Sequence, residues 1–437
     1  MSIACVVGTD LGSTTTKSIV LDESGDILGR GITNSRSDYD RAAQVSRSEA
    51  FITARFNLLR REVEQAAGLE VLKRLLDAFR LEQTLAQLDR LHQLVAGAVA
   101  FGVSGHLTGA AIEAVDVIVG RIRQSELERF ANPDAPKRSD FFRDSVGSAW
   151  SDLSEEIGDP AGMTFDMLLG LYDKCIIQVE NEPLALGFSD HIENALTRIG
   201  GSGAVKTGVQ RAVEAEFEVV GEVGTGYGRQ RLPFPKEMIR SEILCHGLGA
   251  SIMFGGTRTV LDIGGQDTKA IQVDENGIVT SFQMNDRCAA GCGRYLGYIA
   301  DEMNLGLHEL GPLAQESTRT VKINSTCTVF AGAELRERLS LGEKREDILA
   351  GLHRAIMLRA MSLLARSGGV ENEFTFTGGV ARNEAAVAAL TQLVHENYGD
   401  VQINISPDSI YTGALGAALF ARREWLREED SNGGSPS

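Results

Sequence analysis

Hydrophobic and polar positions near the N-terminus follow the pattern of short strands that end at polar, glycine-containing turns. An apolar run over residues 3–8 leads to Asp10, and a turn of glycine, serine and threonine follows over residues 12–16. A second apolar run over residues 17–21 leads through a turn at Gly25 to a third run. Short apolar runs that are bounded by such turns predict three consecutive β-strands.

The same pattern returns in the second half of the chain. Residues 262–277 align with residues 10–25 without a gap, and half of the aligned positions are identical. The identical positions include the aspartate that ends the first strand and the lysine that begins the second. A repeat this far apart predicts two similar domains, because a solenoid repeats about every 20–50 residues. The other interpretation is a pair of unrelated hairpins with common turn chemistry.

Helical periodicity covers much of the remaining chain. Residues 34–99 are predicted to be almost wholly helical, with five apolar side chains on one face (Leu81, Leu85, Leu88, Leu91 and Val95). Apolar positions between Ile348 and Leu364 also recur at helical spacing, and glycines at 368–369 supply a stop. We interpret residues 34–215 as a largely helical insertion with its own core, in which nothing looks catalytic.

These elements predict an α/β fold with two similar domains around a cleft, each a mixed sheet covered by helices. The first lobe comprises residues 1–33 and 216–256, and the second comprises residues 257–422. Small residues over 411–418 predict a helix that crosses another helix closely, although a well-packed core helix has the same pattern. Residues 423–437 end in a polar stretch and are expected to be a disordered tail.

Charge and composition exclude several classes of protein. The 437 residues include 43 basic and 60 acidic side chains, which gives a net charge of -17. Such a surface repels phosphate backbones and anionic membranes, so we expect neither a nucleic-acid nor a membrane partner. No apolar run approaches the ~20 residues of a membrane span, and the N-terminus lacks the basic start of a signal peptide. Six dispersed cysteines do not suggest a disulfide framework, so we expect a cytoplasmic protein.

The repeated turns have the composition of phosphate-binding loops. Each follows an aspartate, Asp10 or Asp262, whose carboxylate is suited to hold Mg²⁺. The turns offer backbone N–H groups and hydroxyls to phosphate oxygens, and their residues are Gly12, Ser13, Thr14, Thr15, Gly264, Gly265 and Gln266. Because the domains are duplicated, we expect the two loops to face each other and to hold one polyphosphate from both sides.

A third loop is expected after the apolar strand at residues 374–377. This strand runs into Gly378 and Gly379 just before a helix. Paired glycines let the backbone approach a flat ligand such as adenosine, and the helix start suits an α-phosphate. The three loops together predict a nucleotide site.

Two cysteines, Cys288 and Cys327, each precede a helical pattern. A thiolate at a helix start is stabilised by the helix dipole and by free N–H groups, and this environment suits a metal–sulfur cluster. From spacing alone, a pair of buried structural cysteines is the more frequent interpretation. The remaining cysteines include three that we interpret as core or loop residues (Cys5, Cys175 and Cys245).

The order of these motifs resembles the superfamily of sugar kinases, actin and heat-shock chaperones, with its duplicated, ribonuclease H-like ATPase domains. A closer similarity, over residues 3–33 and 216–422, is to the ATPases that activate benzoyl-CoA reductases and 2-hydroxyacyl-CoA dehydratases. It rests on motifs at residues 224–229, 245–246, 262–267, 285–291, 325–330 and 377–380.

The resemblance implies an iron–sulfur centre. Cys288 and Cys327 fall where related ATPases bind a [4Fe-4S] cluster, and a homologous, smaller ATPase subunit would supply the other two thiolates. Cys292 departs from the family, which usually carries threonine there, and is ranked below the other two as a spare thiol or an alternate ligand. Electrons from reduced ferredoxin would pass through the cluster to two catalytic iron–sulfur subunits.

The resemblance also implies roles in nucleotide chemistry. Asp10 and Asp262 would organise Mg²⁺, and Lys17 would add positive charge near the phosphates. Gln266 or Asp267 would orient the attacking water, by analogy with other phosphoryl-transfer sites. For Lys17 and Asp267 the alternative is a surface ion pair.

The implied activity is ATP hydrolysis coupled to electron transfer. The adenosine of ATP or ADP would lie against Gly378 and Gly379, with Glu334 as a weaker candidate contact. The long insertion favours the larger ATPase subunit of a benzoyl-CoA reductase, which reduces benzoyl-CoA to a cyclic dienoyl-CoA. The compact activator of a 2-hydroxyacyl-CoA dehydratase is one alternative, and a cluster-free small-molecule kinase of the same fold is another.

Overall fold

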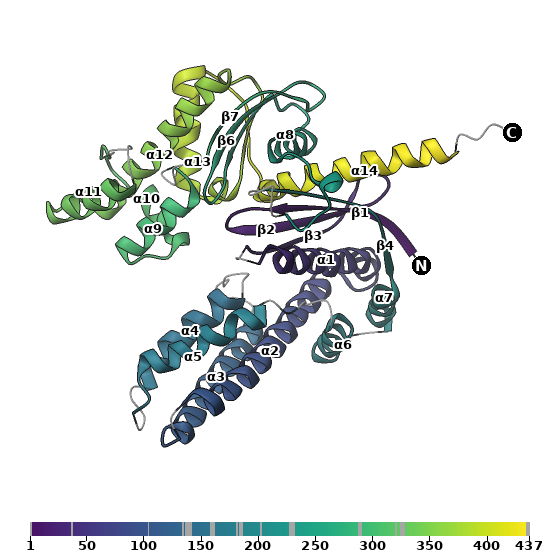
Figure 1. Ribbon diagram of the computed structural model, residues 1–437, viewed down its shortest axis with the longest axis vertical. Helices are drawn as coiled ribbons and strands as arrows, with labels where there is room; N and C mark the ends of the chain where they lie inside the picture. Colours follow the sequence, from purple (N-terminus) through teal and green to yellow (C-terminus); the bar gives the residue numbers. More distant parts are fainter. Residues whose placement is uncertain are drawn as a thin grey trace. The chain divides into compact units, whose positions relative to one another are not determined.

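The computed structural model of the chain divides into two compact units. One comprises Met1–Ile3 and Ser48–Phe217, and the other comprises Ala4–Arg47 and Glu218–Ser437. The structure describes all residues except 1, 36–37, 104, 133–134, 136–141, 158–161, 181, 183–186, 202, 227–231, 287–290, 320, 324–327 and 434–437. The second unit holds both copies of the repeat (Figure 1).

Each copy of the repeat forms three antiparallel strands. They are β1 (Ser2–Leu11), β2 (Thr15–Leu21) and β3 (Ile27–Asn34) in the first copy. In the second copy they are β5 (Thr259–Ile263), β6 (Thr268–Val273) and β7 (Val279–Asn285). The first sheet adds β4 (Glu216–Gly226) in the order β3-β2-β1-β4. The second adds parallel β8 (Phe374–Thr377) and β9 (Ile403–Asn404) in the order β7-β6-β5-β8-β9.

Strand pairing is the same in the two copies. Asp10 lies opposite Lys17, and Asp262 lies opposite Lys269. In both copies the pairing with the third strand shifts just before the last residue of the second strand. Unrelated hairpins have no reason to share both a register and a bulge position. The predicted duplication is therefore confirmed.

Helices follow the second hairpin and build the largest core of this unit. They are α9 (Gly293–Met303), α10 (Leu310–Gln315), α11 (Thr328–Ser340), α12 (Arg345–Ser367) and α13 (Glu384–Tyr398). α12 coincides with the predicted helix over 348–364, ends before Gly368, and packs against β6, β7, α10 and α13. Among described residues it is the one helix apolar and long enough to cross a membrane. Because 67% of its apolar window is buried inside the protein, its composition is that of a core helix.

α8 (Glu242–Met253) and α14 (Thr412–Gly433) cross where both helices have glycine (Figure 1). A Cβ atom on Gly416 would lie 1.9 Å from the carbonyl oxygen of Cys245, and one on Gly249 would lie 1.9 Å from that of Thr412. α14 also lies against β1, where a Cβ atom on Gly8 would lie 2.1 Å from the helix backbone. The predicted close crossing at residues 411–418 is confirmed, and it joins α14 to both α8 and the first sheet.

We expect Gly416→Ala to destabilise the protein by about 1–3 kcal/mol or more, because backbone atoms must move to admit the methyl group. The matched control is Gly297→Ala in α9, where an added Cβ atom meets nothing within 4 Å. There the substitution should leave stability unchanged or raise it by up to about 1 kcal/mol. Denaturant unfolding measures both changes. Equal stability of the two variants would show that the helices do not cross this closely.

The prediction of a disordered tail from residue 423 is wrong as far as Gly433. These residues continue α14, because arginine, glutamate and leucine favour a helix and two side chains add contacts. Glu424 forms an ion pair with Arg240, and Trp425 packs on the core between α14 and the first sheet. Residues 434–437 lie outside the described part of the chain.

The first unit is helical, as the sequence predicts for the insertion. Its helices are α1 (Tyr39–Ala67), α2 (Leu69–Gly102), α3 (Thr108–Ala131), α4 (Phe142–Ile157), α5 (Phe165–Glu180), α6 (Phe188–Ile199) and α7 (Gly203–Glu214). All five apolar residues predicted to share a face of α2 are buried, and two separate apolar clusters form the core.

The compact unit begins later than the predicted insertion, at Ser48 rather than residue 34. The first turns of α1 stay with the first sheet through polar contacts. Oγ of Ser46 lies 2.8 Å from Oγ of Ser18, and Arg47 forms an ion pair of 3.0 Å with Glu222.

Candidate functional site

Asp10 and Asp262 occupy the same position in the two copies of the repeat. Asp10 lies in β1 just before the turn at residues 12–14, and Asp262 lies in β5 just before the turn at residues 264–267. The side chains are almost fully buried, since the residues are only 3% and 2% exposed. A carboxylate without water needs a charged or hydrogen-bonding partner, so both must be satisfied within the site.

The turns that follow the two aspartates lie against each other. A Cβ atom on Gly265 would lie 1.9 Å from Oγ1 of Thr14 and 3.6 Å from Oγ of Ser13. In the first turn, a Cβ atom on Gly12 would lie 3.4 Å from Nζ of Lys17. The structure thus brings the two predicted phosphate loops face to face, and a residue larger than glycine does not fit at position 265.

The third loop, at residues 378–379, meets the second aspartate. Gly378 has a φ angle of 89°, and a Cβ atom there would lie 2.3 Å from the carbonyl oxygen of Ile263 and 3.0 Å from Oδ1 of Asp262. A Cβ atom on Gly379 would meet nothing within 4 Å, so the loop is open on that side. A 3₁₀ turn, η6 (Gly379–Arg382), separates the loop from α13, which Asn383 caps.

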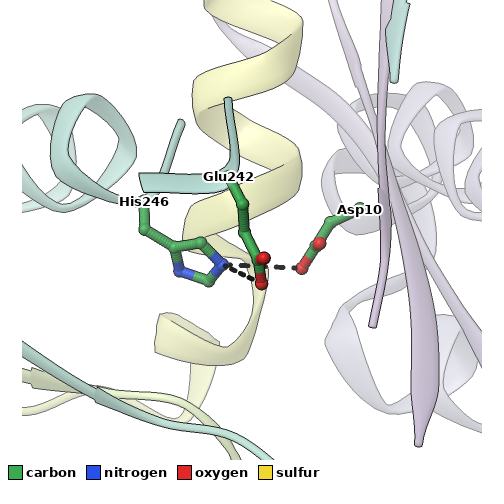
Figure 2. Close-up of side chains that lie close together, drawn as sticks. All are labelled: Asp10, Glu242 and His246. Atoms are coloured by element: carbon green, nitrogen blue, oxygen red, sulfur yellow. Dashed lines mark ion pairs between the residues drawn. The ribbon is translucent and has the colours of Figure 1, made fainter. Parts of the chain in front are cut away.

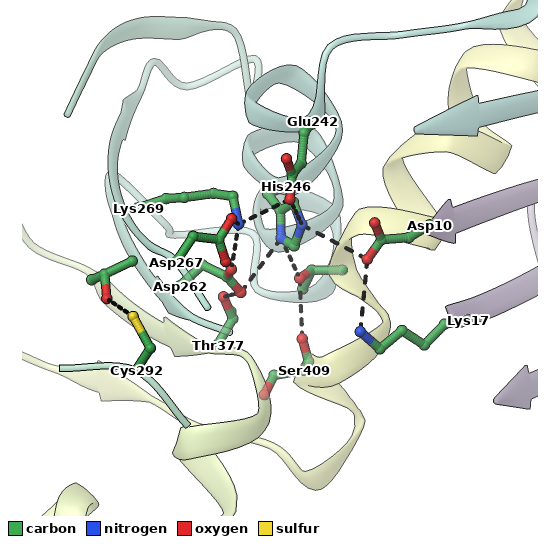
Figure 3. A network of polar contacts seen from close by, with 12 residues as sticks. Asp10, Lys17, Glu242, His246, Asp262, Asp267, Lys269, Cys292, Thr377 and Ser409 are labelled. Atoms are coloured by element: carbon green, nitrogen blue, oxygen red, sulfur yellow. Dashed lines mark hydrogen bonds and ion pairs between the residues drawn. The ribbon is translucent and has the colours of Figure 1, made fainter. Parts of the chain in front are cut away.

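Glu242 and His246 enter the site from α8, one helical turn apart (Figure 2). Nε2 of His246 lies 3.9 Å from Oδ2 of Asp10 and 4.0 Å from Oε1 of Glu242. The other ring nitrogen, Nδ1, lies 3.5 Å from Oδ1 of Asp262 and 3.3 Å from Oγ1 of Thr412. The imidazole therefore stands between the aspartates of the two copies (Figure 3).

Lys269 is buried among carboxylates (Figure 3). Its Nζ lies 2.8 Å from Asp267, 3.0 Å from Glu242 and 3.2 Å from Asp262. Burial lowers the pKa of Lys269, but the three carboxylates outweigh burial and hold the pKa well above its ordinary value. Lys269 is therefore charged at neutral pH, and it neutralises part of the negative charge of the site.

The pKa values of two buried acidic groups shift in opposite directions. Burial raises the pKa of Asp262, yet the charges of His246 and Lys269 outweigh burial and hold the pKa well below its usual range. Thr377 also donates a hydrogen bond of 2.8 Å to Asp262. For Glu242, burial raises the pKa above its ordinary value, and Lys269 and His246 offset only part of the effect. Asp262 is thus held ionised, whereas Glu242 binds a proton more readily than an exposed glutamate does.

Sequence reasoning missed Glu242, and it assigned no role to Lys269 or to His246, although residues 245–246 form one motif of the resemblance. One available signal was the spacing of four residues between Glu242 and His246, which places both side chains on one face of a helix. Another was the second copy of the repeat, in which Lys269 matches Lys17. Neither signal says that α8 carries these side chains to the aspartates, because that contact joins segments far apart in the chain.

Comparison with known proteins assigns the chain to a family. Residues 7–421 match the model of the BadF/BadG/BcrA/BcrD ATPase family. The chain belongs to this family.

Named relatives of this ATPase act in two enzyme systems. The (R)-2-hydroxyglutaryl-CoA dehydratase activating ATPase of Acidaminococcus fermentans is 45% identical over 202 residues, which cover 46% of this chain and 75% of the relative. A benzoyl-CoA reductase subunit of Thauera aromatica is 33% identical over 175 residues, covering 40% and 62%. The crystal structure of component A of the A. fermentans dehydratase matches with a TM-score of 0.51 and 25% identity, covering 97% of this chain and 99% of that chain. The predicted actin-like α/β ATPase fold is confirmed.

The site of this ATPase has the charge and the acceptors that suit Mg²⁺. Oδ1 of Asp10 is buried and has no hydrogen-bond partner among the described residues. Buried acceptors are normally satisfied, and water on a hydrated Mg²⁺ ion would satisfy this one. Four carboxylates (Asp10, Glu242, Asp262 and Asp267) also stand against two ammonium groups (Lys17 and Lys269), which favours a dication.

Other residues predicted from the sequence are spread over the unit. Lys17 lies 3.9 Å from Oδ2 of Asp10, at the edge of the site. Asp267 is buried against Lys269, so its alternative interpretation as a surface ion pair is wrong. Gln266 is half-buried in the second turn. Glu334 lies on α11, where it pairs with Arg338 at 2.8 Å.

The predicted cluster ligands Cys288 and Cys327 lie outside the described residues. α9 begins at Gly293 and α11 begins at Thr328, so a helix follows each cysteine in the sequence as predicted. Cys292 is buried at the start of α9, and its Sγ lies 3.5 Å from Oγ1 of Thr268. The three remaining cysteines (Cys5, Cys175 and Cys245) are buried, as expected of core residues.

The start of α9 is attached to the second phosphate loop. The backbone N–H of Gly293 donates to the carbonyl oxygen of Gly264 at 2.9 Å, and that of Arg294 donates to Gly265 at 2.8 Å. A Cβ atom on Gly293 would also lie 3.5 Å from the Cα atom of Gly265 and 3.6 Å from Val380 in the third loop. The second predicted phosphate loop and the start of α9 are therefore in direct backbone contact.

Proposed function

We propose that this chain is an ATP-hydrolysing activator that delivers electrons to a 2-hydroxyacyl-CoA dehydratase. The observation that carries the proposal is the pair of facing phosphate loops, one of which holds the start of α9 by backbone hydrogen bonds. Nucleotide bound by these loops would lie next to the helix that follows Cys288. Membership of an ATPase family favours hydrolysis over the alternative of a small-molecule kinase.

Each loop has a part in binding nucleotide. Backbone N–H groups of the turns at 12–14 and 265–266 would bind phosphate oxygens, and Lys17 would add positive charge, whereas the N–H of Gly264 donates to the carbonyl oxygen of Asp267. The open side of Gly379 receives the adenosine. Asp10 and Asp262 would hold Mg²⁺, which when bound would neutralise phosphate charge and polarise the terminal phosphoryl group.

Glu242 and His246 are placed to orient the attacking water. Both lie beside Asp10, where the ends of the two loops meet. Because burial raises the pKa of Glu242 above its ordinary value, its carboxylate is a better proton acceptor than an exposed one. Gln266 and Asp267 are the alternatives for this role, but Asp267 is already engaged by Lys269.

Electron transfer requires a cluster and a partner. We propose that Cys288 and Cys327 supply two ligands of a [4Fe-4S] cluster, and that a homologous ATPase chain supplies the other two. Reduced ferredoxin is the proposed donor, and catalytic iron–sulfur subunits are the proposed acceptors. ATP binding would change the position of α9 through Gly264 and Gly265 and so alter the surface around the cluster.

The second candidate function is the larger ATPase subunit of a benzoyl-CoA reductase. The comparisons favour the dehydratase activator, since identity is 45% to the dehydratase relative and 33% to the reductase relative. The helical unit favours the reductase, because 202 residues make up 75% of the dehydratase relative, which is therefore far shorter than this chain. Anaerobic isolation from the native source, with identification of co-purifying chains, distinguishes them. Dehydratase subunits support the first candidate, and reductase subunits support the second.

The cluster assignment predicts that Cys327→Ser abolishes iron–sulfur absorbance in anaerobically purified protein. Serine lacks the soft thiolate that retains iron in a cluster. Cys292→Ser, the matched control, should keep most of the absorbance because Cys292 is buried against Thr268. Iron analysis and the visible spectrum of each variant measure the effect. Full iron content and electron transfer in Cys327→Ser would overturn the ligand assignment.

A further inference from the structure

The side chains of Asp10, Glu242 and His246 bring two carboxylates and an imidazole to one point (Figure 2). Their ligand atoms all lie within 4.8 Å of one another, and all three residues are buried. Two ligands bound to one ion at about 2.1 Å are at most about 4.2 Å apart. The distances of 3.9 Å and 4.0 Å from Nε2 of His246 fall within that limit. A small movement of the Asp10 and Glu242 carboxylates toward each other would let all three ligand atoms bind one ion.

A second observation points to a ligand beside the same Asp10 carboxylate, at its other oxygen. Asp10 is 3% exposed, and its Oδ1 accepts no hydrogen bond from the residues that the structure describes. The other oxygen, Oδ2, is the one that faces His246 and Lys17. A buried, unsatisfied carboxylate oxygen costs free energy unless a cation or a water molecule occupies the space beside it.

The kind of ligand atom decides which cation fits best. Mg²⁺ takes oxygen ligands and keeps much of its water, whereas imidazole nitrogen suits first-row transition metals. The two carboxylates match the charge of a dication. Lys269 offsets part of this charge, since its Nζ lies 3.0 Å from Oε1 of Glu242, but it is shared with Asp262 and Asp267.

We propose that Asp10, Glu242 and His246 form a binding site for a divalent transition-metal ion such as Mn²⁺, which the chain binds without nucleotide. The inference goes beyond the proposed function, which needs only Mg²⁺ brought with ATP. In the presence of ATP the same ion would lie beside the phosphates, so the site would accept transition metals in place of Mg²⁺.

The experiment titrates Mn²⁺ alone into the full-length chain, after divalent ions have been removed with a chelator. Loss of the free Mn²⁺ signal in electron paramagnetic resonance should show one bound ion, and Mg²⁺ should compete only at higher concentration. His246→Gln and Glu242→Gln should each weaken binding by more than about tenfold. The matched control is His308→Gln, an exposed histidine that should leave binding unchanged.

A second measurement uses the unaltered protein, so the test does not depend on whether a variant folds. Pulsed resonance of the bound Mn²⁺ should reveal coupling to a ¹⁴N nucleus of the imidazole. Absence of that coupling, equal competition by Mg²⁺, or full Mn²⁺ affinity in folded His246→Gln would each overturn the inference. ATP hydrolysis with Mg²⁺ and no binding of Mn²⁺ alone would refute the metal site and leave the proposed function intact.

Discussion

Asp10→Asn and Asp262→Asn should each lower the rate of ATP hydrolysis by at least about 100-fold. Each substitution removes one of two buried carboxylates that end equivalent strands and face the phosphate loops. Asparagine has nearly the same shape, so the lost rate reports charge rather than packing. Release of inorganic phosphate by purified variants measures the effect, and the visible spectrum should still show the cluster.

The matched control is Asp400→Asn, which changes the same charge at an exposed position before β9. It should hydrolyse ATP at the rate of the unaltered protein. Hydrolysis at the normal rate in either Asp10→Asn or Asp262→Asn would mean that the repeated loops do not bind the phosphates of ATP.

Lys269→Met should destabilise the protein by about 3–5 kcal/mol at pH 7, because three buried carboxylates lose the charge that they share. Methionine keeps most of the length and volume of the side chain. Lys17→Met is the matched control, since Lys17 is partly exposed and lies 3.9 Å from a single aspartate. Its effect should be within about 1 kcal/mol. Denaturant unfolding at neutral pH measures both variants.

Lys269→Met should also change how the free energy of unfolding depends on pH. The pKa of Asp262 is held below its unfolded value, so the stability from this group is present above about pH 4 and is lost as the pH falls. Lys269 helps to cause that shift, and its own pKa is raised, so its contribution persists throughout the neutral range. The difference in the free energy of unfolding between the unaltered protein and Lys269→Met should therefore narrow as the pH falls below about 4. A difference that stays constant as the pH falls below about 4 would contradict the charge-based explanation.

The repeat could be predicted because its matching positions lie in two continuous segments of the sequence. The match between segments 10–25 and 262–277 contains the strands, the turns and the aspartates, and the structure repeats the pairing residue by residue. The small residues at 411–418 were equally informative, since only close approach requires glycine at position 416. Such local patterns predicted the loops of the site and the helix that crosses beside it.

The rest of the site could not be read from local pattern. His246 lies between Asp10 and Asp262 only because α8 packs across α14, and that contact depends on tertiary structure. A surface ion pair stayed open as the alternative for Asp267, because its sequence neighbours do not reveal that β6 buries Lys269. The tail was predicted wrongly for another reason. Its last residues are polar, and we extended the expectation of disorder from them to the helix-forming segment at 423–433.

The insertion explains why the enzyme system was harder to predict than the chemistry. Its length favoured a benzoyl-CoA reductase, whereas the ATPase part of the chain is more similar to a dehydratase activator. The described side chains around Asp10 and Asp262 all belong to the unit of residues 4–47 and 218–437.

The central claim is that nucleotide held between the repeated loops controls a cluster on the same chain. The most direct measurement is the electron paramagnetic resonance spectrum of the anaerobic, chemically reduced protein with and without Mg²⁺ and ATP. The unaltered protein should contain iron and change its spectrum when ATP is added. Asp262→Asn should keep the spectrum and lose the change. An iron-free protein, or a spectrum that ATP leaves untouched, would contradict the account.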